Sequence, residues 1–458
     1  MILWDILIAL SVIFTVLSLC GITRHLYGIL KDTALAKRRP FALAAACAIC
    51  VLGAAALSLT LLGAVNTAVV ILHFGAFLLA AACLVHHFFK KGNKRTANVA
   101  ALCLALLCTV GYLGAAYRNS AEIRKTEYTV FTEKAVPKLR IALFADAHIG
   151  ATLDDEKFSA IVEKINAQQP DIVLIAGDFI DENTAAEEVT AACAALRGFT
   201  APLGVYYVFG NHDTGFFEKE KQQEKVQLLR KGLQKSGVRI LEDAGYALEN
   251  GYYLLGRADA GSEENDAPRA DAKTLLEKAP PECYTILLDH QPTDYKKEAE
   301  AGADLVLSGH THGGQLLPLQ LGMRLLHAGG VDLVYGMKTL GNTAFCVTSG
   351  LSSWGIRFKS GCFSEYVILT IEPQKSVTLR RGRQCPTNNL TRAQDTMCRR
   401  GRFFDAGSLT CNAFSYCFSN SFATSCKSRR FLQESLLYVT KQPLLSSLFF
   451  PVLSFYLS

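Results

Sequence analysis

The chain has 458 residues, enough for two or three domains. Half of them are hydrophobic and only 19% are charged, which is an apolar balance for a soluble enzyme and indicates membrane segments. The net charge is +6, because Lys and Arg outnumber Asp and Glu. The Lys and Arg residues cluster beside apolar stretches and in the far C-terminal part. This distribution is typical of membrane-helix flanks rather than of a nucleic-acid-binding face, so we expect no nucleic-acid partner.

Four apolar stretches occupy the first third of the sequence, near residues 2–22, 41–63, 66–88 and 97–117. Each is close to the roughly 20 residues with which an α-helix crosses a bilayer. Buried core helices and a signal peptide are the alternatives, but Met1 to Asp5 carry no positive charge, which disfavours a signal peptide. We predict an α-helical membrane domain over residues 1–120 with four transmembrane helices.

The loops between these stretches differ in charge. The second loop, residues 63–67, has no Lys or Arg, whereas the first holds Arg24, Lys31, Lys37, Arg38 and Arg39 and the third holds Lys90, Lys91, Lys94 and Arg95. Positively charged loops stay in the cytoplasm. With an even number of spans, the N-terminus and everything after residue 118 are then outside. The sequence predicts a multi-pass protein of the cell membrane whose following domain is extracytoplasmic.

From Leu139 the pattern changes to short apolar runs separated by charged amphipathic stretches. We expect strands at 141–145, 172–176, 205–209, 285–288, 305–307, 345–348 and 366–371, and helices near 154–168, 184–197, 216–236, 271–278 and 293–301. Strands that alternate with helices predict an α/β domain with buried strands, here over residues 137–373. In such domains the catalytic groups gather beyond the C-terminal ends of the strands.

Five short motifs follow these predicted strands. They are Asp146-Ala147-His148, Gly177-Asp178, Gly210-Asn211-His212-Asp213, the single His290, and Gly309-His310-Thr311-His312. Alone, an Asp or His at a strand end usually caps a helix or solvates a loop. Together, carboxylates, imidazoles and one amide oxygen suit divalent metals such as Mn, Fe or Zn. Residues two apart on an extended segment also point to the same side, so each Asp-x-His or His-x-His pair can face one cavity.

The order of these motifs resembles that of the calcineurin-like metallophosphoesterase superfamily, and the preceding apolar stretches resemble its bacterial membrane-associated YkuE/YaeI-like branch. The resemblance covers about residues 137–373 and implies a four-layer α/β/β/α sandwich behind the membrane helices. It also implies an enzyme, a hydrolase of phosphomonoester or phosphodiester bonds that uses a hydroxide activated by two divalent metal ions.

The resemblance implies a role for each motif residue. Asp146, His148 and His312 would hold the first metal, Asn211, His290 and His310 the second, and Asp178 would bridge them. His212 would donate a proton to the leaving oxygen, and Asp213 would orient the His212 imidazole. Arg357 is a weaker candidate, either for substrate phosphate or for a salt bridge at a domain edge.

Two other interpretations of the function remain open at this point. One is a metal-binding membrane protein without catalytic activity, and the other is a zinc hydrolase of the amidohydrolase type, in which the His-x-His pair normally follows the first strand. The substrate is expected to be phosphorylated, and a lipid-linked phosphate is attractive because the site is tethered to a membrane. The residues select neither the metal nor an oligomeric state.

Residues 374–458 differ from the rest of the chain, with five Cys, many Arg and Ser, and little regular period. The stretch 444–457 is apolar but too short to span a bilayer, and Pro451 interrupts it. We predict an atypical C-terminal extension, either translated out of frame or a disordered basic tail.

Overall fold

A computed structural model describes residues 2–89, 92–215, 219–248, 250–260, 269–326 and 330–374. Residues Met1–Gln374 form one compact unit. The predicted C-terminal extension, residues 374–458, lies outside the described residues except for Gln374.

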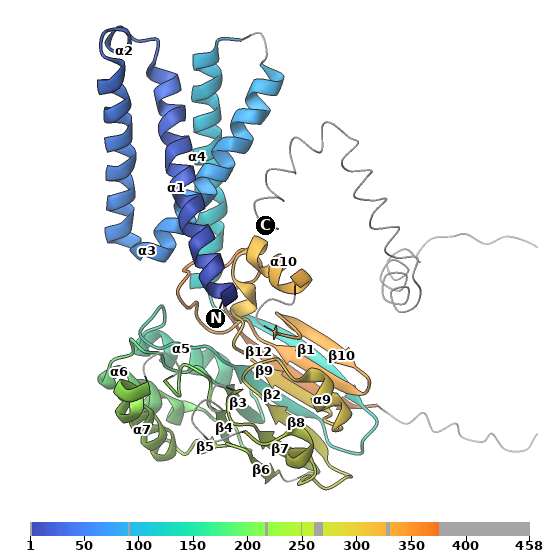
Figure 1. The fold of residues 1–458 in the computed structure, drawn as a ribbon. Helices are drawn as coiled ribbons and strands as arrows, with labels where there is room; N and C mark the ends of the chain where they lie inside the picture. Colours follow the sequence, from blue (N-terminus) through green and yellow to red (C-terminus); the bar gives the residue numbers. More distant parts are fainter. Residues whose placement is uncertain are drawn as a thin grey trace, which may run out of the picture. The chain divides into compact units, whose positions relative to one another are not determined.

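The N-terminal part consists of long apolar helices (Figure 1). Their bounds are α1, Ile2–Leu30; the short α2, Ala34–Arg38; α3, Pro40–Phe88; and α4, Lys94–Ala121. Helices α1, α3 and α4 each contain a segment that is long and apolar enough to cross a membrane. α3 contains both stretches predicted at 41–63 and 66–88, and its backbone leaves helical geometry at Gly63, where φ is 76° and ψ is 173°. Figure 1 shows the chain reversing its direction at this break.

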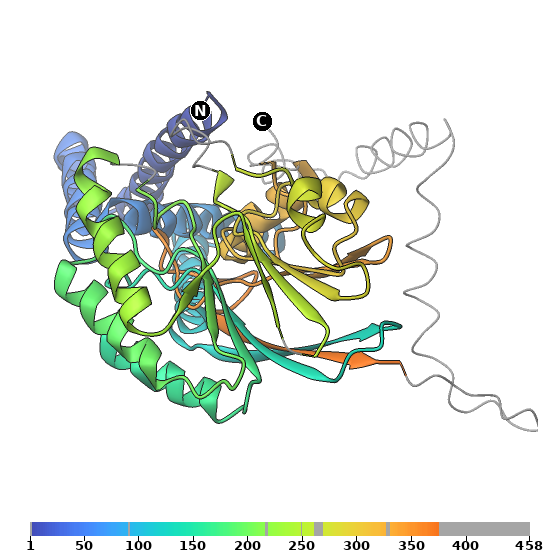
Figure 2. The same cartoon turned by 90° about the horizontal axis from the view of Figure 1, so that it is seen from below.

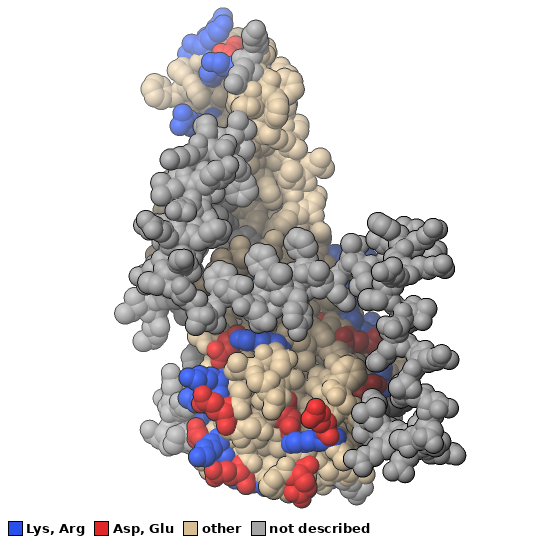
Figure 3. Space-filling view, turned by 90° about the vertical axis from the view of Figure 1, so that its right-hand side faces the viewer, with Lys and Arg blue, Asp and Glu red and all other residues tan. Residues whose placement is uncertain are grey.

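The break at Gly63 brings the two halves of α3 together. The hydroxyls of Ser58 and Thr67, one on each side of the break, lie 3.1 Å apart. Val51 from the first half and Leu78 from the second half belong to one buried cluster with Ile22 of α1 and Ala101 of α4. Figure 3 shows Lys and Arg side chains gathered at the end of these helices that points away from the rest of the compact unit. This is the end where α2 carries Lys37 and Arg38. The helices therefore have a charged end and an apolar middle.

Two six-stranded sheets form the second part of the unit. Strand order is β1-β12-β2-β3-β4-β5 in the first sheet and β10-β11-β9-β8-β7-β6 in the second. The first sheet contains β1, Arg124–Thr132; β2, Leu139–Phe144; β3, Ile172–Ala176; β4, Val205–Val208; β5, Arg239–Ile240; and β12, Glu365–Pro373. The second contains β6, Ala244–Ala247; β7, Tyr252–Gly256; β8, Tyr284–Leu288; β9, Leu305–Ser308; β10, Gly336–Leu340; and β11, Thr343–Val347.

Alternation of side chains along the strands builds four layers (Figure 2). Ile141 and Leu143 of β2 face the second sheet and pack with Ile286 of β8 in the central core. Ala142 and Phe144 of the same strand face outward, into a second core with three helices. These are α5, Asp155–Asn166; α6, Ala186–Ala195; and α7, Lys219–Lys235.

Helices also cover the outer face of the second sheet. Leu287 of β8 and Val306 of β9 pack there against the side chains of two short helices. These are α8, Ala272–Leu276, and α9, Tyr295–Glu300. The predicted four-layer α/β/β/α sandwich is confirmed.

All seven predicted strands and all five predicted helices of this region are present, with small shifts at their ends. The sequence prediction missed β1, which pairs in parallel with β12 and so extends the first sheet to before residue 137. Side chains along β1 are alternately exposed and half-buried, so this edge strand has no apolar run to mark it. β7 was also missed, since a short run of five residues, four of them buried, does not identify a strand by periodicity alone.

Candidate active site

The motif residues follow strands that end at one edge of the sandwich. β2, β3 and β4 are parallel neighbours in the first sheet, and β8 and β9 are parallel neighbours in the second. Asp146 and Asp178 follow β2 and β3, and His290 and His310 follow β8 and β9. Because both sheets deliver their loops to the same place, residues more than 160 positions apart in sequence meet there, for example His148 and His312.

The first group of candidate ligands consists of Asp146, His148 and His312. All three are buried, and the Nε2 atoms of His148 and His312 lie 3.2 Å apart. His312 Nε2 is 4.0 Å from Asp146 Oδ1. Two nitrogens that each lie about 2.1 Å from one tetrahedral cation are about 3.4 Å apart, so this spacing fits a shared divalent metal.

The second group consists of Asp178, His290 and His310. Asp178 Oδ2 lies 3.0 Å from His290 Nε2 and 4.0 Å from His148 Nε2, so this carboxylate lies between the two groups. Asn211 Oδ1 is 2.9 Å from His310 Nδ1. The fold thus brings together all seven residues that the sequence predicted as ligands.

Burial sets the charge of these groups. It lowers the pKa of His148 and of His310 to about 3, and it holds the pKa of His312 well below its usual range. These three imidazoles are therefore neutral, the form that binds metals. Burial and the neighbouring Asp178 raise the pKa of Asp146 to about 7. Two buried carboxylates that raise each other's pKa are stabilised by a bound cation.

The two ring nitrogens of His290 have different partners. His290 Nε2 lies 3.0 Å from Asp178 Oδ2, inside the candidate site. His290 Nδ1 lies 2.7 Å from the Ala176 carbonyl oxygen, so this ring nitrogen can donate to the backbone and leave Nε2 free toward Asp178. A histidine held in this way is ready to bind a metal through its other nitrogen.

The backbone at the candidate ligands is strained. Five of them have positive φ although they are not glycines: Asp146 (51°), His148 (40°), Asp178 (52°), His310 (72°) and His312 (48°). Such conformations cost about 1–3 kcal/mol each and persist only where the surroundings enforce them. Part of that enforcement is visible, because the backbone N–H of His310 donates to Asp146 Oδ1 at 2.9 Å and that of His212 donates to Asp178 Oδ1 at 2.9 Å.

Two motif glycines are required by close approach. A Cβ on Gly210 would lie 2.2 Å from Asp178 Oδ1, and a Cβ on Gly309 would lie 2.8 Å from Asp146 Oδ2 and 2.5 Å from the Cβ of Ala145. Neither position has room for a side chain. The glycines therefore let the backbone of one strand end pack directly on the carboxylate that follows another.

His212 lies beside both groups, and its partner differs from the predicted one. Its ring is 4.9 Å from the His148 ring and 4.7 Å from the Trp354 ring. His212 Nδ1 is 2.8 Å from Glu182 Oε1. Burial alone would lower the pKa of His212, but the hydrogen bond to Glu182 and the charge of Asp178 outweigh it and raise that pKa. Glu182, rather than Asp213, is the carboxylate that contacts this imidazole.

The prediction that Asp213 orients His212 is therefore wrong. The buried carboxylate of Asp213 accepts hydrogen bonds from the backbone N–H groups of Asp178, Phe179, Ile180 and Gly210 and from the Tyr207 hydroxyl, at 2.7–3.1 Å. Asp213 thus fixes the loop that carries Asp178. Sequence adjacency suggested the wrong partner, because Glu182 is 30 residues from His212 and no local motif includes it.

Arg357 is exposed, and its backbone N–H donates to Asn66 Oδ1 in α3 at 2.8 Å. Among the described residues, no ion pair joins Arg357 to a candidate ligand. Lys359, which the sequence prediction missed, is the buried cation of this segment. Its Nζ donates to the carbonyl oxygens of Ser349 (2.6 Å) and Gly350 (3.4 Å), on a turn that packs against Asp146. Burial lowers the pKa of Lys359, and the nearby Asp146 carboxylate partly opposes that shift.

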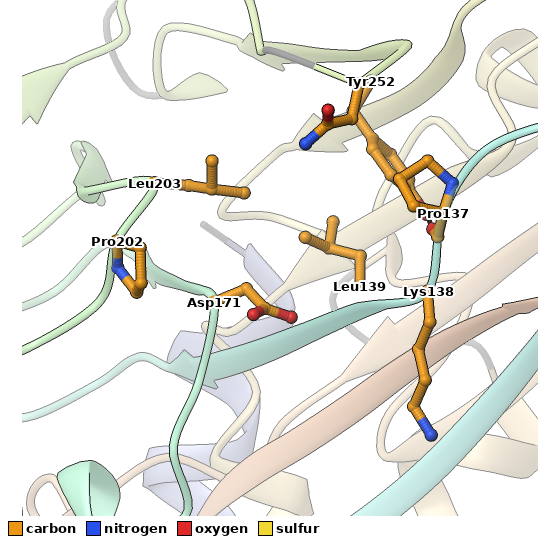
Figure 4. A pocket seen from close by; sticks show the side chains of 8 residues that line it. Pro137, Lys138, Leu139, Asp171, Pro202, Leu203 and Tyr252 are labelled. Carbon is orange, nitrogen blue, oxygen red and sulfur yellow. Dashed lines mark hydrogen bonds between the residues drawn. The ribbon is translucent and has the colours of Figure 1, made fainter.

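A pocket of about 170 Å³ lies at the opposite edge of the first sheet (Figure 4). Leu139, at the start of β2, and Asp171, directly before β3, line it. Asp171 accepts a hydrogen bond from the backbone N–H of Arg140, so its carboxylate is used in holding these two strand starts together. This pocket is separate from the candidate active site.

Comparisons with known proteins agree with this geometry. Residues 139–314 match the profile of the calcineurin-like phosphoesterase family. The chain is 31% identical over 288 residues to an uncharacterized metallophosphoesterase of Helicobacter pylori strain J99, which covers 62% of this chain and 73% of that protein. It is 28% identical to a transmembrane protein with metallophosphoesterase domain of Bos taurus, over 60% of this chain and 62% of that protein. It is 27% identical to the uncharacterized metallophosphoesterase YkuE of Bacillus subtilis, over 58% of this chain and 92% of that protein. This chain belongs to the calcineurin-like metallophosphoesterase family.

Proposed function

We propose that this metal-dependent phosphoesterase is anchored in the cell membrane and hydrolyses phosphomonoester or phosphodiester bonds at a two-metal site. The observation that carries the proposal is the position of Asp178, whose Oδ2 lies 3.0 Å from a histidine of one ligand group and 4.0 Å from a histidine of the other. A carboxylate in that position can serve two cations at once. Two bound divalent cations would supply Lewis-acid activation of water and stabilise phosphoryl charge.

The chain's own residues complete the chemistry. Asp146, His148 and His312 would hold the first metal, and Asn211, His290 and His310 would hold the second. Mn, Fe and Zn are all compatible with these donors. His212 donates a proton to the leaving oxygen, and the hydrogen bond to Glu182 keeps the imidazole protonated and oriented for that step. Asp213 supports the site by fixing the loop of Asp178.

The long helices anchor this site in the membrane. Their charged connection carries Lys37 and Arg38, and such connections stay in the cytoplasm. Asn66, in the uncharged connection, instead contacts Gly355 and Arg357 next to the sandwich. The sandwich then lies on the outer side, where its substrates are phosphorylated molecules of the membrane surface or the surrounding space.

An activity screen of the full-length chain tests this function. The purified protein is stripped with a chelator, reloaded with Mn, and assayed against p-nitrophenyl phosphate, bis-p-nitrophenyl phosphate and pyrophosphate. We expect hydrolysis of the monoester or the diester that the chelator abolishes and Mn restores. Metal binding without hydrolysis of any of the three would favour a non-catalytic metal-binding protein and contradict the proposal.

A further inference from the structure

Helix α10, Leu317–Leu326, presents its apolar side to the outside of the protein. Leu317, Leu321 and Leu325 follow one another at four-residue spacing, so they form a single stripe along the helix. Their side chains are 52%, 53% and 65% exposed. The exposed stripe therefore consists of large apolar side chains.

A buried polar residue of α10 holds this helix to the protein. Gln320 is only 4% exposed, and its Nε2 donates to the carbonyl oxygens of Gly313 (2.7 Å) and Gly361 (3.0 Å). A surface helix of a water-soluble domain buries its leucines and exposes its glutamine. α10 does the reverse and is fixed in that orientation, which marks the leucine stripe as a contact surface.

Hydrogen bonds connect the start of α10 to the membrane helices. The backbone N–H of Leu317 donates to Ser360 Oγ at 2.8 Å, and Ser360 Oγ is 2.7 Å from the hydroxyl of Tyr112 in α4. Tyr112 lies five residues before the end of the apolar stretch 97–117, which corresponds to about 7.5 Å along the helix. Amphipathic helices in membrane surfaces lie about 5–10 Å deep, so α10 begins at the corresponding level.

Apolar packing continues from the membrane helices to α10. Leu316, the residue directly before α10, packs in one buried cluster with Val69 of α3 and with Leu113 and Ala116 of α4. In Figure 1, α10 lies beside the ends of these helices. This buried contact places the leucine stripe next to the helices that we propose to span the bilayer, which favours lipid over a second copy of the chain or another protein.

We propose that α10 lies in the outer surface of the lipid bilayer, with Leu317, Leu321 and Leu325 among the acyl chains. α10 begins five residues after His312, a candidate ligand of the first metal, so its docking holds the metal site at the membrane surface. The substrate class that fits this placement is a phosphate ester on an amphiphile embedded in the bilayer. This inference rests on the membrane anchoring and the hydrolytic site proposed above.

Fluorescence quenching tests the docking of α10 independently of activity. Leu321→Trp is introduced in a Trp4→Phe background, so that Trp354 is the only other tryptophan, and the full chain is placed in bilayers of phosphatidylcholine brominated on its acyl chains. The matched control is Phe131→Trp. Phe131 is 61% exposed but lies about 23 Å along β1 from Arg124, where the chain leaves α4.

We expect the Leu321→Trp protein to be quenched at least about twofold more than the Phe131→Trp control, because only the former side chain enters the bilayer. Equal quenching of the two proteins would overturn the docking of α10. Quenching of Leu321→Trp without any hydrolysis would keep the docking and contradict the proposed function instead.

Activity on two matched substrates tests the substrate class. The double variant Leu321→Glu/Leu325→Glu should hydrolyse p-nitrophenyl hexadecyl phosphate in bilayers about tenfold or more slowly than the unmodified protein, and soluble p-nitrophenyl ethyl phosphate at an unchanged rate. Phe131→Glu should leave both rates unchanged. An equal effect on both substrates, or none on either, would overturn the proposal that α10 selects bilayer-embedded esters.

Discussion

Glu182 Oε1 lies 2.8 Å from His212 Nδ1, and this pair joins the loop after β3 to the loop after β4. The carboxylate fixes one ring nitrogen, and the imidazole lies 4.9 Å from the His148 ring and 4.7 Å from the Trp354 ring. We expect His212→Ala to keep the metals and to slow turnover by about 10²–10⁴-fold, the usual effect of losing a general acid.

Leaving-group dependence separates this role from a structural one. The loss in His212→Ala should shrink with nitrophenol esters, since nitrophenolate departs without a proton, and Glu182→Gln should show the same dependence with a smaller loss. Steady-state kinetics on alkyl and nitrophenyl esters provide the comparison. Equal losses on good and poor leaving groups would exclude proton donation by His212.

Asp213 should behave differently from Glu182, because its carboxylate accepts five hydrogen bonds inside the protein. Asp213→Ala leaves those donors buried and unpaired, so we expect the free energy of unfolding to fall by about 3–5 kcal/mol. Thermal unfolding in detergent measures the loss, with Glu163→Ala, at an exposed position of α5, as control for removing one carboxylate. An Asp213→Ala protein as stable as the control would contradict the anchoring role.

Gly309 has no space for a side chain, since a Cβ there would lie 2.8 Å from Asp146 Oδ2. Gly309→Ala should therefore displace Asp146, lower metal content and reduce stability by about 1–3 kcal/mol. Gly322 in α10 has no atom within 4 Å of the corresponding position, so Gly322→Ala is the matched control and should retain both metals. Metal analysis by mass spectrometry distinguishes the two variants. Equal metal content would show that a methyl group at residue 309 does not disturb metal binding by Asp146.

The charged connections between the helices predict on which side of the membrane each segment lies, and fused reporters can measure it. Alkaline phosphatase fused after Ala121, at the end of α4, should be active, and green fluorescent protein at the same point should stay dark. Fusions after Gly92, in the connection before α4, should give the opposite pattern. A fluorescent fusion after Ala121 would place the sandwich in the cytoplasm and shift the expected substrates toward soluble nucleotides.

Local patterns in the sequence predicted the strands and helices of the α/β domain and the convergence of the candidate ligands, whereas the four-layer arrangement followed from the family resemblance. Each ligand motif directly follows a buried apolar strand, and parallel strands bring their ends together without any further information. The sequence prediction failed where the determinant was not local. Glu182, Lys359 and the edge strand β1 act through partners 9 to 241 residues away, and no motif or period marks them. The break in α3 was predicted in part. The uncharged residues 63–67 indicated a loop between two helices, and the structure has a single helix that is interrupted at Gly63, where φ is positive.

The central claim, that Asp178 serves two metals in one hydrolytic site, is tested most directly by the metal content and activity of Asp178→Asn. The unmodified full-length protein should hold about two divalent metal ions per chain. Asp178→Asn should lose metal from both ligand groups and lose hydrolysis of all phosphate esters, including nitrophenyl esters. An Asp178→Asn protein that keeps both metals and full activity would contradict the claim.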